Sequence, residues 1–257
     1  MNLGIVLSGG GIRGIAHLGV LKALKEKKIT VSRIAGTSAG SIAGALYANQ
    51  VDPYDALKIF QNARLLKILK IAYGQPAFLN LESTYNFFKQ YLPQDSFDSL
   101  SIPLTITATN YSKGNLEYFD KGDHLIKKML ASCCIPGVFN PIKIDGSLYV
   151  DGGVLNNFPI EPLLGKCDLI LGSSCNHLPT VSTAPSIKKV LERTATLAVN
   201  HSMSQKSKNL NLLIEPHNLG NIGVFEVNRA EEIFWLAHEE ALKQLEKSDL
   251  FSSINKK

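Results

Sequence analysis

The sequence predicts one α/β domain, built on a mostly parallel sheet that helices cover on both faces. Short apolar runs bounded by glycine or polar residues alternate with longer stretches in which apolar residues recur every three or four positions. Strands that alternate with helices in this way form parallel sheets. The 257 residues fall in the size range of one large α/β domain, and no change of composition divides them. We therefore expect residues 1–257 to form a single domain.

The chain opens with a strand, a glycine loop and a helix. Leu3–Leu7 is a short apolar run that predicts a buried strand. The loop SGGGIRG at residues 8–14 follows it, and from Ile12 to about Lys27 apolar residues recur at every third position, as on one face of a helix. A second strand is expected over Val31–Ala35, and the alanine-rich stretch Ser41–Ala48 predicts a closely packed helix.

The next region predicts two further helices. Amphipathic spacing runs over residues 53–71, with a proline at the first helical turn, and favours a helix that packs on the core. One ridge of basic residues leaves a second interpretation open, an interfacial lid with a basic rim: Arg64, Lys67 and Lys70. A loop over Tyr73–Asn80 and a short helix over Glu82–Leu92 are expected next.

The second half of the chain continues the alternation. Strands are expected at Leu104–Ala108 and up to Tyr118-Phe119, and Asp145-Gly146 between two extended pieces predicts a hairpin. Two core-type strands and three helices complete the pattern: strands at Asp168–Gly172 and Leu210–Glu215, and helices at Leu125–Cys134, from about Ile187, and from Arg229 to about Leu245.

Residues 36–40, Gly-Thr-Ser-Ala-Gly, fit the G-x-S-x-G pattern of a strand-to-helix turn that presents a nucleophilic serine. The pattern alone is weak, because glycine and serine are common. The preceding glycine loop also fits the dinucleotide pattern G-x-G-x-x-G, but the acidic residue that would hold a ribose at the end of the second strand is missing. The loop's backbone N–H groups suit an oxyanion equally well. This favours a serine hydrolase with Ser38 as the nucleophile.

A serine nucleophile needs a base. None of the six histidines follows a strand in a glycine-flanked turn, and His177 in a loop is the best histidine candidate. Asp151 is better placed, because it ends a strand and two glycines follow it. A buried carboxylate with a raised pKa can act directly as the base. Asp145 is explained more simply as a residue of the hairpin turn.

Several ordered motifs resemble the patatin-like phospholipase family. They are the run at residues 8–14 with its continuation His-Leu-Gly-Val-Leu at 17–21, Gly-Thr-Ser-Ala-Gly at 36–40, and Asp-Gly-Gly at 151–153. Ala131-Ser132 with Ile135-Pro136, and Asn-Asn-Phe-Pro at 156–159, also fit the family's pattern. The resemblance covers roughly residues 3–50 and 104–175, while residues 50–100, the expected lid or acyl-pocket region, match nothing specific.

The resemblance implies a three-layer α/β/α sandwich and a Ser-Asp dyad that uses no histidine. Carried over to this sequence, it makes Ser38 the nucleophile and Asp151 the base, and it gives the oxyanion hole to four residues of the glycine loop: Gly9, Gly10, Gly11 and Arg13. Within that loop the amides of Gly10 and Gly11 would be the main donors, and Arg13 would add charge or brace the loop. His17 is expected to be structural.

The expected reaction is hydrolysis of a phospholipid or another fatty-acyl ester through an acyl-enzyme, without cofactor or metal. The alternatives are a Ser-His-Asp esterase and a non-catalytic lipid-binding or regulatory protein of the same fold. A net charge of +5 is compatible with transient contact at an anionic membrane surface but does not demand it. No nucleic-acid partner is expected. The head group, acyl position and oligomeric state are not readable from the sequence.

Composition and cysteine spacing bear on the expected location. No stretch approaches the length of a spanning helix, and the first apolar run breaks after a few residues without a basic segment before it. Four cysteines lack the C-x-x-C spacing of a zinc or redox site and are expected to be free thiols: Cys133, Cys134, Cys167 and Cys175. We therefore expect a cytoplasmic protein that acts at the periphery of a membrane.

Overall fold

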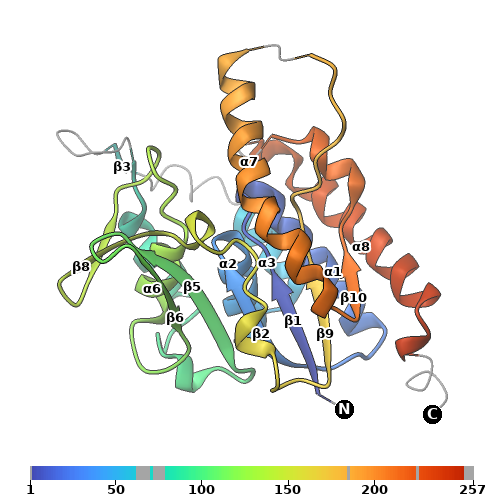
Figure 1. Cartoon of the computed structure of the whole chain (residues 1–257). Helices are drawn as coiled ribbons and strands as arrows, with labels where there is room; N and C mark the ends of the chain where they lie inside the picture. The colour runs from blue at the N-terminus through green and yellow to red at the C-terminus, as the bar shows by residue number, and fades with distance from the viewer. Residues whose placement is uncertain (1, 62–69, 72–78, 184–185, 224–225, 252–257) are drawn as a thin grey trace.

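The computed structural model describes residues 2–61, 70–71, 79–183, 186–223 and 226–251 (Figure 1). The strands are β1 (Leu3–Leu7), β2 (Val31–Thr37), β3 (Lys70–Ile71), β4 (Leu79–Asn80), β5 (Leu104–Asn110), β6 (Asn115–Phe119), β7 (Ile142–Ile144), β8 (Ser147–Asp151), β9 (Leu169–Ser173) and β10 (Leu212–Ile214). The helices are α1 (Ala16–Glu26), α2 (Ala39–Ala48), α3 (Pro53–Gln61), α5 (Tyr85–Lys89), α6 (Leu125–Ser132), α7 (Ile187–Lys206) and α8 (Ala230–Lys247).

The main sheet holds eight strands within the described residues. Its order is β10-β9-β1-β2-β5-β8-β7, and β6 pairs with β5 outside this path. The five strands from β10 to β5 run parallel, whereas β6, β7 and β8 join antiparallel. The expected mostly parallel sheet is therefore confirmed, with an antiparallel extension at one side.

Both faces of this sheet are covered. All five residues of β1 are buried, as in the centre of a parallel sheet. Ile5 and Leu7 belong to the large cluster that α1, α2, α3 and α8 cover, while Val6 between them packs with Phe158 in a smaller cluster on the other face. Met203 of α7 packs against that second cluster. The three-layer arrangement follows from this alternation of side chains along the strands.

Strands β2 and β8 lie end to end along one edge of β5. Because β6 occupies the opposite edge over Ile106–Asn110, β2 and β8 share the remaining one. Thr37, the last residue of β2, pairs with Thr107, and Asp151, the last residue of β8, pairs with Ala108. The carboxyl ends of the two strands thus meet at consecutive residues of β5, and the site is built at this junction.

The region after α2 differs from the expectation. The helix expected over residues 53–71 is α3 up to Gln61, residues 62–69 lie outside the described part, and Lys70–Ile71 form β3, paired antiparallel with β4. The helix prediction is therefore wrong at its end, because pairing with Leu79–Asn80 overrides local periodicity. Two members of the basic ridge, Arg64 and Lys67, also lie outside the described part. The helix expected over Glu82–Leu92 is a 3-10 turn at Leu81–Thr84 followed by α5.

Candidate active site

Ser38 occupies a sharp turn between β2 and α2. Its backbone has φ 52° and ψ −123°, a conformation that L-residues adopt rarely and that costs free energy. The turn ends the strand and starts the helix within one residue, so the side chain lies above the carboxyl end of the sheet. Such strained strand-to-helix turns are where nucleophilic serines are found.

Small residues on both sides make this turn possible. A Cβ at Gly36 would lie 2.6 Å from the carbonyl oxygen of Gly40, and a Cβ at Gly40 would collide with the carbonyl oxygen of Leu7 at the end of β1. A Cβ at Gly14 in the glycine loop would collide with Cβ of Ala39. The glycines therefore let the start of α2 pack directly on β1 and on the glycine loop.

Asp151 is the hydrogen-bond partner of Ser38. Ser38 Oγ donates to Asp151 Oδ2 at 2.7 Å, and the amide of Gly153 donates to Asp151 Oδ1 at 2.7 Å. Both side chains are buried. The second oxygen of the carboxylate is thus held by the backbone, which orients the first toward the serine.

Burial dominates the ionisation of Asp151. It raises the pKa of the carboxyl from 3.8 to about 6, although the hydrogen bonds from Ser38 and Gly153 pull the pKa down. A carboxylate with this pKa is ionised at neutral pH and yet binds a proton more readily than an ordinary aspartate. This is the ionisation behaviour that a general base requires.

Ser132, near the end of α6, braces the turn from a third direction. Its Oγ accepts a 2.8 Å hydrogen bond from the amide of Ser38 and donates a 2.7 Å bond to the carbonyl of Thr107 on β5. In the sequence, Ser132 is recognisable only as part of a family pattern, which assigns it no role. A small hydroxyl residue at the end of a helix was the available signal, but its partner depends on packing between distant elements.

The glycine loop lies beside this turn. A Cβ at Gly9 would lie 3.2 Å from Cβ of Ser38. The amide of Gly9 donates to the carbonyl of Asn157 at 3.1 Å, so it braces the loop. Within the described part of the chain, the structure gives no hydrogen-bond acceptor to the amides of Gly10 and Gly11. These two backbone donors are available to a ligand.

Arg13 braces the loop through Asn176. Its guanidinium donates to Asn176 Oδ1 at 3.2 Å, and Asn176 Nδ2 donates to the carbonyl of Gly9 at 2.5 Å. Of the two roles considered for Arg13, these contacts match bracing. Asn176 was not among the residues predicted from the sequence. Its position three residues after β9 was the available signal, since that end of β9 lies next to the end of β1.

His17 and His177, the two histidines considered from the sequence, make their hydrogen bonds with residues other than Ser38 and Asp151. His17 is buried, with Nδ1 2.8 Å from Ser173 Oγ and Nε2 2.8 Å from the carbonyl oxygen of Ser8. Burial lowers the pKa of His17 to about 4, against the effect of its hydrogen bond to Ser8, so the ring is neutral. His177 stacks on His217 and lies 3.4 Å from Glu215. Among the side chains that the structure describes, no histidine contacts Ser38 or Asp151 through a hydrogen bond.

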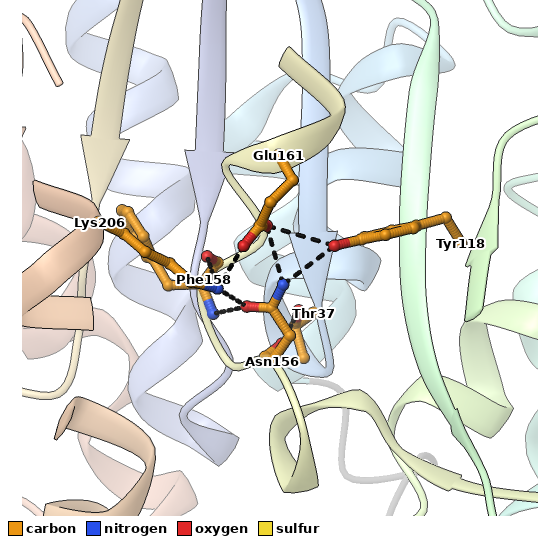
Figure 2. Close-up of polar contacts among 6 residues, drawn as sticks. All are labelled: Thr37, Tyr118, Asn156, Phe158, Glu161 and Lys206. Atoms are coloured by element: carbon orange, nitrogen blue, oxygen red, sulfur yellow. Dashed lines mark hydrogen bonds and ion pairs between the residues drawn. The ribbon is translucent and has the colours of Figure 1, made fainter. Parts of the chain in front are cut away.

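A polar cluster holds the segment that follows Asp151 (Figure 2). Asn156 Nδ2 donates to Glu161 at 2.9 Å and to the Tyr118 hydroxyl at 3.2 Å, and Lys206 of α7 pairs with Glu161 at 2.7 Å. The carbonyl of Asn156 accepts a 2.9 Å hydrogen bond from Thr37, the residue before Ser38. The cluster therefore ties the ends of β2, β6 and α7 to one loop.

Among the described residues, no group of three or more histidine, cysteine, aspartate or glutamate side chains is arranged to hold a metal ion. The four cysteines are free, and burial raises the pKa of Cys133 and Cys134. None of the described helices is long and apolar enough to cross a membrane.

Comparison with known sequences identifies relatives. The model of the patatin-like phospholipase family matches residues 5–164. An uncharacterised NTE family protein of Mycobacterium tuberculosis is 32% identical over 67% of this chain and 48% of its own length. The lysophospholipase nte1 of Aspergillus fumigatus is 29% identical over 95% of this chain and 18% of its own length. The chain thus spans about half the length of the mycobacterial relative and less of the fungal one.

Solved structures are similar in fold. VipD of Legionella pneumophila superposes with a TM-score of 0.56 at 15% identity, over 96% of this chain and 67% of VipD. The type III effector ExoU of Pseudomonas aeruginosa superposes with a TM-score of 0.50 at 17% identity, over 97% of this chain and 54% of ExoU. These similarities support the three-layer fold alone.

Proposed function

Because this chain belongs to the patatin-like phospholipase family, we propose that it hydrolyses fatty-acyl esters of lipids with Ser38 as nucleophile and Asp151 as base. One observation supports this assignment above the others. The hydroxyl of a serine on a strained strand-to-helix turn donates a 2.7 Å hydrogen bond to a buried carboxylate whose pKa is raised to about 6. That pair needs no histidine to move a proton.

The first half of the reaction forms an acyl-enzyme. Ser38 Oγ attacks the ester carbonyl carbon while its proton passes to Asp151 Oδ2. The oxyanion of the tetrahedral intermediate accepts hydrogen bonds from the amides of Gly10 and Gly11, which have no acceptor within the described part of the chain. The intermediate collapses, and the lipid alcohol leaves with the proton that Asp151 held.

The second half releases the fatty acid. Water attacks the acyl carbon as Asp151 takes one of its protons, and the same two amides hold the new oxyanion. Collapse breaks the bond to Ser38 Oγ, which regains the proton from Asp151. Gly9, Arg13 and Asn176 act by holding the loop rather than by contacting the reacting atoms.

A covalent probe and three variants test this proposal. We expect a fluorophosphonate to label the wild-type protein, and we expect Ser38→Ala and Asp151→Asn to lose hydrolysis of a short-chain nitrophenyl ester by about a thousandfold or more. His177→Ala should remain active. Full activity of Ser38→Ala would refute the nucleophile assignment. An active Asp151→Asn together with an inactive His177→Ala would indicate a Ser-His-Asp esterase instead.

The substrate class needs a separate assay. Incubation with mixed phospholipids and mass detection of fatty acid and lysolipid would identify the head group and acyl position. Binding of lipid without any release of fatty acid would favour a non-catalytic lipid-binding protein. That residues 1–257 form one catalytic domain, with an acyl pocket or lid contributed by residues 50–100, belongs to the same proposal, as does action in the cytoplasm at a membrane periphery.

A further inference from the structure

Helix α7 is the element that extends furthest from the sheet. Figure 1 shows its amino-terminal half rising past the rest of the molecule, on the side toward which β1 and β10 point. Its carboxyl-terminal half lies against the body, where Met203 packs on the smaller apolar cluster. Ser38 follows β2, which runs parallel to β1, so the projecting half lies on the same side of the sheet as the candidate active site.

Helix α7 carries an apolar stripe that faces solvent, and three of its four residues lie in the projecting half. Ile187 is 81% exposed, Leu191 65%, Leu197 51% and Val190 44%. Their spacing of three, four and ten residues from Ile187 places them on one face of the helix. An amphipathic helix normally turns its apolar face to the core, and a continuous exposed one marks an interaction surface.

The opposite face of α7 makes the contacts with the protein. Asn200 Nδ2 donates to the carbonyl of Asn176 at 2.7 Å, and Met203 packs inward. At 100° per residue, both lie on the far side of the helix from Ile187 and Leu191. Ile187 and Leu191 therefore point away from the body, whereas Leu197 lies one turn before Asn200, closer to the face by which the helix is attached.

The charge of this half favours an anionic partner. Three basic residues, Lys188, Lys189 and Arg193, stand against one acidic residue, Glu192, in the first two turns. A segment with a net positive charge and an exposed apolar stripe has the composition of helices that bind at the surface of anionic bilayers.

The attached end of α7 reaches the candidate site. Lys206 pairs with Glu161 and donates to Asn156 Oδ1 at 2.6 Å, as Figure 2 shows, and the carbonyl of Asn156 is held by Thr37. Asn176, which Asn200 holds, braces the glycine loop. The projecting helix is thus fixed to residues that flank both the serine turn and the loop.

We propose that the stripe of α7, formed by Ile187, Val190, Leu191 and Leu197, docks on a lipid bilayer that contains anionic lipids. The inference rests on the proposed function, since it supplies the surface on which a lipid-acyl hydrolase meets its substrate. When the helix is docked, the carboxyl ends of the parallel strands, where Ser38 lies, face the bilayer.

Vesicle binding in a Ser38→Ala background tests the docking without hydrolysis of the vesicles. Vesicles of phosphatidylcholine with a minority of phosphatidylglycerol are sedimented with the protein. We expect Ser38→Ala to bind, high salt to weaken binding, and addition of Ile187→Asp with Leu191→Asp to weaken it by about tenfold or more. Ile187→Ser with Leu191→Ser should weaken it as well, which separates lost apolar contact from added negative charge.

Leu164→Asp is the matched control. Leu164 is also an exposed leucine, at 44%. It lies in the loop before β9, near the amino-terminal ends of the parallel strands, whereas α7 projects beyond their carboxyl ends. We expect this variant to bind the vesicles as Ser38→Ala does. Far-UV circular dichroism and thermal melting establish that each variant is folded.

Three results would overturn the docking. These are absence of vesicle binding by Ser38→Ala, undiminished binding by both stripe variants, and a stripe variant that turns a dimer into a monomer in light scattering, which would assign the stripe to a second copy of the chain. Failure of the proposed function is recognised separately. If the wild-type protein hydrolyses no ester while the stripe still governs vesicle binding, the docking stands and the hydrolase assignment falls.

Discussion

Asp151 has to be ionised to accept the proton of Ser38, and its burial opposes that ionisation. The carboxyl pKa of about 6 therefore predicts that kcat/KM for a short-chain ester falls about tenfold per pH unit below pH 6 and is level above it. The measurement is a pH profile from about pH 4.5 to about pH 8, after separate incubation at each pH to establish stability.

Temperature distinguishes this carboxyl group from a histidine, whose ordinary pKa is close by. The ionisation of a carboxylic acid has little enthalpy, so the midpoint of the pH profile stays in place on warming if Asp151 is the base. If an imidazole is the base, the midpoint moves to lower pH on warming. A midpoint that falls with temperature and disappears in His177→Ala would assign the base to that histidine.

The ionised Asp151 also costs stability. Its pKa in the folded protein is about 6 against 3.8 when unfolded, which at 1.36 kcal/mol for each tenfold change in proton affinity amounts to about 3 kcal/mol. This cost is fully present above pH 6, shrinks as the pH falls, and is absent below pH 3.8, where both states are protonated. Asp151→Asn should therefore raise the free energy of unfolding by up to about 3 kcal/mol at pH 8, and by less at pH 5.

Urea unfolding at both pH values measures the difference. Asparagine can still accept the hydrogen bond from the amide of Gly153. Asp145→Asn, the same change in an exposed turn, should alter stability by less than about 0.5 kcal/mol. A less stable Asp151→Asn at pH 8 would show that the hydrogen bonds of the carboxylate outweigh its burial.

Individual residues of the candidate site differ in how far the sequence could predict them. Ser38 and Asp151 follow strands in glycine-rich motifs, so local pattern singled them out. Asn176 and Ser132 act through partners 167 and 94 residues away, Gly9 and Ser38. Their roles depend on which strands become neighbours, and a single sequence contains no local signal of that.

Helix α2 owes its position to the absence of one side chain. A Cβ at Gly40 would meet the backbone of Leu7 and Ser8, which cannot move aside, whereas a Cβ at Gly44 would meet only side-chain methyl groups at 3.0 and 3.1 Å. We expect Gly40→Ala to cost about 2 kcal/mol or more and to inactivate the protein. Gly44→Ala should change stability by less than about 1 kcal/mol, because the higher helix propensity of alanine offsets the tighter contact.

Thermal unfolding and ester hydrolysis of both variants make the comparison. The two positions lie one turn apart on the same helix, so any general effect of alanine is common to both. Equal stability and activity of Gly40→Ala and Gly44→Ala would show that the turn at Ser38 does not depend on close contact with the end of β1.

Elements governed by neighbouring residues were predicted better than elements governed by distant ones. The hairpin of β7 and β8 forms at Asp145-Gly146, where φ is 46° and 84°, the left-handed values that this pair favours. By contrast, Lys70–Ile71 pairs with Leu79–Asn80, and the helix predicted there was wrong. Helical periodicity cannot reveal a strand of two residues whose pairing partner lies outside the periodic stretch.

At the scale of the whole molecule, the candidate site exists because two strands of opposite direction share one edge of β5. Strand alternation predicted a mostly parallel sheet, but it could not predict that β8 returns antiparallel and ends where β2 ends. The distance between Ser38 and Asp151 is therefore set by the register of both strands on Thr107 and Ala108. Any fragment that keeps these motifs but loses the sheet would lose the site.

The range matched by the family model ends at residue 164, before β9. β9 lies between β1 and β10, and without it the buried strand β1 would become an exposed edge. Ser173 and Asn176, which hold His17 and the carbonyl of Gly9, would be lost too. We therefore expect residues 1–165 not to fold alone, and residues 1–251 to unfold in one cooperative transition.

Calorimetry and limited proteolysis of the two fragments test this expectation. Residues 1–251 should give equal calorimetric and van't Hoff enthalpies and should resist protease, and residues 1–165 should show no transition and be degraded. A folded 1–165 that a fluorophosphonate labels at Ser38 would mean that the matched range is an autonomous domain. In that case the bracing of the glycine loop by Asn176 would be dispensable, and the support that we assign to α7 through Asn200 would have no bearing on the candidate site.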